Sequence, residues 1–174
     1  MPIAEKFANR FFCEAHEAAA GTAAFTEVPT YLNAFEKKAF VIHRLEYNFE
    51  NGIIPLMAAV GDMVCAALTS TNVYATLRPQ DILNEPGLHD YVALEALMVG
   101  AAAGRQDTIA PIVHDFTELP GGGLIVPGRP LFVGAYGYSL ANPVHVSVRG
   151  WFSIIELKAE EFLDLVDAYR IVTK

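Results

Sequence analysis

The sequence comprises 174 residues, enough for one domain with a sizeable hydrophobic core. Hydrophobic residues make up 53% of it and charged residues only 18%, and the formal net charge is −8 with lysines and arginines scattered along the chain. Direct binding of nucleic acid requires clustered cations and membrane insertion requires a long apolar run, so we expect neither here.

The N-terminal stretch fits two structures. Its composition favours a helix with a proline near the start and a glycine at the end, but apolar residues also recur at every second position from Phe11 to Ala15. We predict an extended arm or hairpin over residues 1–35, followed by a β-sandwich domain over residues 36–174. The N-terminal stretch lacks the basic and apolar regions of a secretory signal. Because chain ends are poorly ordered unless they are tied down, the arm is a candidate for contacts between subunits.

Two strands are predicted in the first half of the domain. Residues 40–50 place Val41, His43, Leu45, Tyr47 and Phe49 on one face and polar residues on the other, and an Asn-Gly turn signal follows. Residues 62–71 are apolar on both faces, which indicates a central strand covered on both sides. Cys65 in this run and Cys13 before it are predicted to be buried free thiols, although their pairing stays open.

An irregular connection is predicted after the second strand, because prolines stand at positions 79 and 86 and a glycine at 87. The residues from 91 to 103 fit both a helix and a strand. Strands are then predicted at 109–117, 124–126 and 130–138, separated by the glycine-rich turn 119–123 and a Pro-Gly turn.

The most regular pattern lies at residues 142–156. Valines at 144, 146 and 148, then Gly150, Phe152 and Ile154, share the side predicted to face the core, and His145, Arg149, Trp151 and Ile155 share the other. Two alternatives to an outward, exposed Trp151 remain. A bulge at Gly150 would turn Trp151 inward, or the helix predicted at 159–170 would cover it. Taken together, these elements predict a mainly β fold, an antiparallel jelly-roll-like sandwich of about eight strands with a short C-terminal helix.

Catalytic chemistry finds little support in the sequence. The five histidines show no short metal-ligand spacing, and the adjacent pairs His89-Asp90 and His114-Asp115 would point to opposite faces of their strands. His43 is predicted to be a hydrogen-bonded core histidine. No motif of a nucleophilic enzyme or a phosphate-binding loop is present, so we expect no enzyme, cofactor or metal ion, with a cupin-like metal enzyme kept as the third candidate function.

The high apolar content has two explanations, a sheet buried on both sides or a surface covered by partner subunits. Tryptophan and arginine are enriched at interaction hot spots, so exposed side chains on the last strand are candidates for an interface. A sugar- or receptor-binding surface built on Tyr136, Tyr138 and Trp151 is the alternative function. The predicted interface residues are Trp151, Arg149, Ile155, Tyr136 and Phe11.

The order of features from residue 40 onward resembles that of single jelly-roll capsid proteins of tailless icosahedral viruses. The resemblance lies in the paired segments FVIHRLEYNF and DMVCAALTST, the closely spaced strands of IVHDFTELPGGGLIVPGRPLFVGAYGYSLANPVHVSVRGWFSIIEL, and the short closing helix. It implies a structural coat subunit of the virion that self-associates into a homo-oligomer or shell, with or without a companion coat subunit. Small coat proteins of viruses with an internal membrane fit best, because they need no basic arm.

Overall fold

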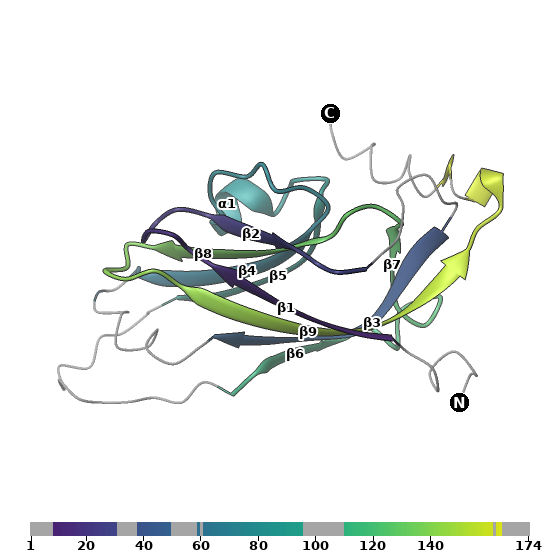
Figure 1. Ribbon diagram of the computed structural model, residues 1–174, viewed down its shortest axis with the longest axis horizontal. Coiled ribbons are helices and arrows are strands. Elements are labelled where there is room, and N and C mark those ends of the chain that lie inside the picture. The colour runs from purple at the N-terminus through teal and green to yellow at the C-terminus, as the bar shows by residue number, and fades with distance from the viewer. Residues whose placement is uncertain are drawn as a thin grey trace.

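The computed structural model describes residues 9–30, 38–49, 59, 61–95, 110–161 and 163–164. Within these residues, nine strands form two antiparallel sheets packed face to face (Figure 1). Sheet A contains, in order, β1 (Asn9–His16), β9 (His145–Glu156), β3 (Lys38–Phe49) and β6 (Ile112–Asp115), and β7 (Leu124–Pro127) also pairs with β3. Sheet B contains, in order, β2 (Ala24–Glu27), β8 (Phe132–Tyr138), β4 (Met63–Thr69) and β5 (Leu88–Glu95). A short helix, α1 (Pro79–Ile82), lies on the outer side of sheet B.

The strand pairing is that of a jelly roll. β6 and β7 pair with successive stretches of β3, at 44–47 and 39–42, so together they fill one strand position. With that position counted once, the first strand pairs with the last, the second with the next to last, and so on inward to β4 and β5. A long hairpin folded so that its pairs alternate between two sheets has this order. The predicted fold class, a mainly β sandwich of about eight antiparallel strands, is confirmed.

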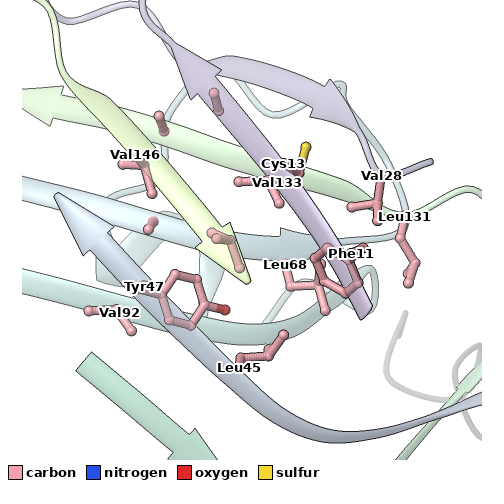
Figure 2. Close-up of a cluster of buried hydrophobic side chains, with 14 of the residues drawn as sticks. Phe11, Cys13, Val28, Leu45, Tyr47, Leu68, Val92, Leu131, Val133 and Val146 are labelled. Atoms are coloured by element: carbon pink, nitrogen blue, oxygen red, sulfur yellow. The ribbon is translucent and has the colours of Figure 1, made fainter. Parts of the chain in front are cut away.

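The core lies between the two sheets (Figure 2). Leu45, Tyr47 and Val146 reach it from sheet A, and Leu68 and Val133 reach it from sheet B, all with almost no exposed surface. Strand β9 keeps its valines and Phe152 buried and Arg149 exposed, as the alternation predicted. Ile154, which was also predicted to face the core, is 38% exposed. Gly150 keeps its place in the ladder opposite Phe11 of β1, so no bulge forms there.

The register break lies in β3 instead. Ile42 pairs with Phe152 and Arg44 pairs with Trp151, which leaves His43 as the extra residue of a bulge. The prediction that Val41 and His43 share the inner face of this strand was therefore wrong. Phe40 and Ile42 take those core positions, because one inserted residue shifts every side chain on one side of it to the opposite face.

His43 holds the glycine-rich loop against sheet A. Its Nδ1 lies 2.8 Å from the Gly122 carbonyl oxygen and donates to it, and in the neutral ring Nε2 accepts from the Ser153 hydroxyl at 2.8 Å. A Cβ on Gly123 would lie 2.7 Å from the Ile42 carbonyl oxygen. Loop 119–123 is thus fastened to β3 at the bulge, and His43 is a hydrogen-bonded, buried histidine as predicted, on the outer rather than the core side of the strand.

Sheet B is covered on both faces, as predicted for residues 62–71. On its outer side, Cys65, Ala67 and Tyr136 pack against Leu77 and Ile82 of the connection between β4 and β5. Tyr91 of β5 fastens this connection by donating a hydrogen bond from its hydroxyl to the Leu77 carbonyl oxygen at 2.7 Å. The predicted irregular connection therefore forms a second, smaller core, with α1 inside it.

The N-terminal residues divide differently from the prediction. Residues 9–16 and 24–27 are strands of opposite sheets, hydrogen-bonded to β9 and β8, so this part is neither a separate arm nor a hairpin. Glu17, which follows β1, is buried, and its carboxylate accepts hydrogen bonds from the backbone N–H groups of Gly137 and Val144, both at 2.9 Å. Burial raises the pKa of this carboxyl above its usual value, and those N–H groups oppose the shift.

The remaining predictions meet the described residues only in part. The stretch 91–103 fitted both a helix and a strand. Its first part, residues 91–95, is a strand that belongs to β5, and residues 96–103 lie outside the described part. The helix predicted from residue 159 is present at 159–161 and 163–164, and residues 165–170 lie outside the described part. The two cysteines are buried, free and in different cores, and burial raises the pKa of each thiol to about 11.

Candidate functional site

One row of side chains crosses the outer face of sheet A at Trp151. The register places Trp151 of β9 directly between Arg10 of β1 and Arg44 of β3. The two guanidinium carbons lie 5.9 Å and 5.1 Å from the centroid of the indole ring. Arginine at this distance is attracted to the face of the ring by about 0.5–1 kcal/mol at exposed sites. The ring is therefore held on the outer face with only part of its surface exposed.

A second row runs beside the first. Phe12, Arg149, Glu46 and Val113 lie side by side on four neighbouring strands. Phe12 is 51% exposed and Val113 is 43% exposed. Glu46 lies 3.9 Å from Arg149 and 3.8 Å from Arg44, so its carboxylate links the two rows. We call these two rows the Trp151 face, which comprises Arg10, Phe12, Arg44, Glu46, Val113, Arg149 and Trp151.

The structure brings together some of the predicted interface residues and not others. Trp151 and Arg149 lie on the Trp151 face, and Ile155 is partly buried further along β9. Phe11 and Tyr136 are only 6% and 7% exposed, so the exposure on which their selection rested is absent. Phe11 points between the sheets because it shares a face with Cys13, and Tyr136 is covered by the connection between β4 and β5.

The predicted stacking surface for sugars is also covered. Tyr138 has the Arg78 guanidinium 4.3 Å from its ring centroid, and Tyr136 lies in the smaller core. Trp151 has an arginine on either side. Stacking of a sugar requires a free ring face, so these three rings do not form the proposed platform.

A polar cluster that the sequence did not indicate joins the two sheets. The Asp90 carboxylate of β5 accepts a hydrogen bond from the Tyr47 hydroxyl at 2.8 Å and from His114 Nδ1 of β6 at 2.8 Å. Tyr47 is fully buried, and burial together with the Asp90 charge raises its pKa well above the usual value. The cluster therefore fastens β5 of sheet B to β3 and β6 of sheet A.

His89 precedes this cluster on β5, and both of its ring nitrogens are buried. Burial, with a smaller contribution from the positive charge of Arg129, lowers the pKa of His89 to about 4. The imidazole is therefore neutral at physiological pH. Among the described residues, no group of three or more His, Cys, Asp or Glu side chains is placed to hold a metal ion.

Acid should destabilise the protein through His89. An unfolded histidine has a pKa near 6.5, so the unfolded chain takes up a proton on this group as the pH falls from 6.5 towards 4, while the folded chain does not. The stability gained above pH 6.5 is lost in that window, by about 2 kcal/mol between pH 7 and pH 5. Urea unfolding of the wild type and of His89→Gln at both pH values measures this difference. The raised pKa of Glu17 makes the protein more stable in acid, and it does so in both proteins. The effect of His89 is therefore the difference between the wild type and His89→Gln in their change of stability with pH. An equal change in the two proteins would contradict the expectation.

The described helices include none that is both long and apolar enough to cross a membrane. No protein-family model and no curated protein sequence matches the chain.

Three solved structures of one viral protein match most of the chain at low sequence identity. The unassembled pentamer of Merkel cell polyomavirus VP1 matches with a TM-score of 0.47 and 7% identity, covering 88% of this chain and 97% of that chain. The same virus's VP1 in complex with disialyllactose matches with a TM-score of 0.45 and 8% identity over 88% and 97% of the two chains. Its complex with the GD1a oligosaccharide matches with a TM-score of 0.42 and 9% identity over 83% and 78%.

Proposed function

We propose that this chain is a coat subunit of a virion that associates with copies of itself through the Trp151 face. One observation carries the proposal: the chain covers the outer face of one sheet and leaves apolar side chains exposed on the outer face of the other. The outer face of sheet B is covered by the chain's own connection between β4 and β5. The outer face of sheet A keeps Phe12 and Val113 exposed beside a tryptophan and three arginines.

The composition of the Trp151 face suits an interface. A stable interface buries about 800 Å² on each partner, and its energy is concentrated in a few tryptophan, tyrosine and arginine side chains. Here Trp151 is already fixed between Arg10 and Arg44, so a partner would pay little conformational entropy to contact it. Phe12 and Val113 add apolar surface on either side of the Arg149–Glu46 pair.

The net charge of −8 limits which coat this would be. A shell of such subunits would not neutralise a packaged genome by itself, because each subunit carries a net negative charge. The charge agrees with the small coat proteins of viruses with an internal membrane, where lipid lies beneath the shell. A companion coat subunit would be a second partner for the same face.

Assembly can be tested by light scattering across protein concentration and salt, followed by electron microscopy of any large species. We expect the wild type to form larger species as concentration rises, and Trp151→Ala to weaken association at least about thirtyfold, the effect of losing a hot spot of about 2 kcal/mol. Phe12→Ser should weaken it as well with little effect on folding, because Phe12 is half exposed.

Leu83→Ser is the matched control, because Leu83 is 56% exposed but lies in the connection over sheet B. It should leave assembly unchanged. A wild type that stays monomeric at all concentrations, or a Leu83→Ser variant that loses assembly as much as Phe12→Ser, would contradict the proposal.

A further inference from the structure

A cavity of about 340 Å³ lies beside sheet B, away from the Trp151 face. Its polar lining comes from two parts of the chain, residues 70–89 and Arg129. Ser70 and Thr71 follow β4, Tyr74 and Glu85 belong to the connection to β5, His89 lies on β5, and Arg129 lies in the turn between β7 and β8. This volume is at the lower end of the range for small-molecule sites.

Backbone contacts fix the walls of this cavity. The Ser70 N–H donates to the Gly87 carbonyl oxygen at 2.8 Å, which joins the two ends of the connection. A Cβ on Gly87 would lie 2.6 Å from the Tyr74 hydroxyl, so glycine at this position lets the Tyr74 side chain come close to the backbone. In the turn before β8, the Gly128 N–H donates to the Lys38 carbonyl oxygen at 2.8 Å and the Arg129 N–H to the Pro127 carbonyl oxygen at 2.7 Å. The backbone on both sides of the cavity is therefore held in place.

The charges around the cavity favour an anion. Arg129 forms no ion pair with a carboxylate of the described residues, and its positive charge acts on the His89 ring across the cavity wall. Burial disfavours a proton on His89, and the Arg129 charge disfavours it further. An anion in the cavity would be attracted by Arg129 and would offset the repulsion between the Arg129 charge and a protonated His89. The opposing charge is Glu85, whose side chain is exposed at the rim.

We propose that this cavity binds the oxyanion group of a small hydroxylated molecule, with Arg129 as the charged partner. A guanidinium binds phosphate, sulfate or carboxylate groups through two parallel hydrogen bonds. Ser70, Thr71 and Tyr74 supply hydroxyl groups that would bond the remainder of the molecule.

The binding should be linked to proton uptake. A bound anion makes protonation of His89 more favourable, so the complex holds more protons than the free protein as the pH falls towards 5. The affinity for an anion should therefore rise as the pH is lowered, by at most tenfold per pH unit for one proton. Glu85 and Tyr74 are the other titratable side chains lining the cavity.

Sulfate is the first probe, because its charge does not change between pH 5 and pH 8. Calorimetric titration with sulfate should show saturable binding by the wild type that is several-fold tighter at pH 5.5 than at pH 7.5. Arg129→Gln should weaken it more than tenfold, and Arg129→Lys should weaken it less. His89→Gln should bind at pH 7.5 but lose most of the pH dependence, and Glu85→Gln should bind more tightly at pH 7.5 and keep the dependence on His89.

Arg78→Gln is the matched control, because Arg78 stacks on Tyr138 outside the cavity. It should bind sulfate as the wild type does. Sulfate also stabilises folded proteins through exclusion from their surfaces. The decisive quantity is therefore the difference in sulfate affinity between Arg129→Gln and Arg78→Gln. Circular dichroism verifies that every variant is folded. No saturable binding to the wild type, or equal weakening by Arg129→Gln and Arg78→Gln, would overturn the proposal.

Two further probes separate the sources of the oxyanion. Inorganic phosphate tests the bare group, and glucose 6-phosphate tests the group with hydroxyls attached, with glucose as the uncharged reference. The proposal predicts tighter binding of glucose 6-phosphate than of inorganic phosphate, and no binding of glucose. Phosphate binding as strong as that of glucose 6-phosphate would limit the site to a free anion and contradict the role given to the hydroxyl groups.

Discussion

Replacing Gly150 by alanine should destabilise the fold by about 3 kcal/mol, although it adds a single methyl group. A Cβ on Gly150 would lie 2.1 Å from Cε1 of the Phe11 ring, well inside any allowed contact. Phe11 is the direct cross-strand partner of Gly150 and is itself buried, so its ring cannot move away without opening the core. Urea unfolding of the variant, read as the change in midpoint at constant slope, measures the loss.

The paired substitution identifies the cause. Phe11→Ala alone should cost about 3–5 kcal/mol as a large-to-small change in the core. In the Phe11→Ala background, the alanine at 150 should cost less than about 1 kcal/mol, because the atoms that it would meet are gone. Ser147→Ala on the same strand is the control for a small change of side chain, with an expected effect within about 1 kcal/mol. If the effects of Phe11→Ala and Gly150→Ala on the free energy of unfolding were additive, the clash with the Phe11 ring would not explain why position 150 requires glycine.

Replacing Asp90 by alanine should destabilise the protein by about 3 kcal/mol. Tyr47 has no exposed surface, so its hydroxyl would lose its acceptor with no water to replace it, and His114 would lose its partner across the sheets. Tyr47→Phe removes the hydroxyl itself and leaves Asp90 bonded to His114, so it should cost only about 1 kcal/mol. Guanidinium unfolding of both variants measures the two losses.

Asp115→Ala provides the matched comparison, because Asp115 is an exposed aspartate on β6 whose carboxylate accepts hydrogen bonds from Thr117. Its loss should change the free energy of unfolding by less than about 1 kcal/mol. An effect of Asp90→Ala no larger than that of Asp115→Ala would mean that the cluster joining the sheets contributes little to stability.

The sequence predicts the strands of this fold well wherever one face is buried and the other is wet. Strand β9 is the clearest case, since its valines and Phe152 lie inward as the alternation indicates. Strand β4 is predicted by a different pattern, because apolar residues on both of its faces correspond to two cores. In each case the environment of a side chain follows from its position along one strand.

What the sequence could not predict depends on contacts between distant segments. The bulge at His43 shifts the register of β3 by one residue, and the local pattern fits either register. Tyr136 alternates as an exposed residue would, yet residues 70–87 fold over it. The Tyr47–Asp90–His114 cluster draws one residue from each of three strands, so no spacing along the chain announces it. Arg129 and His89 stand far apart in the sequence, and nothing in it indicates that the charge of Arg129 acts on His89.

The pairing of β1 with β9 has a consequence for how the protein is made. Residues 9–16 find their partners at 145–152, so β1 leaves the ribosome long before the strand with which it pairs. Contacts this remote in sequence slow folding into the range of milliseconds to seconds. During that delay the apolar side of β1 is exposed in the nascent chain, where Glu14 and His16 interrupt an otherwise aggregation-prone run.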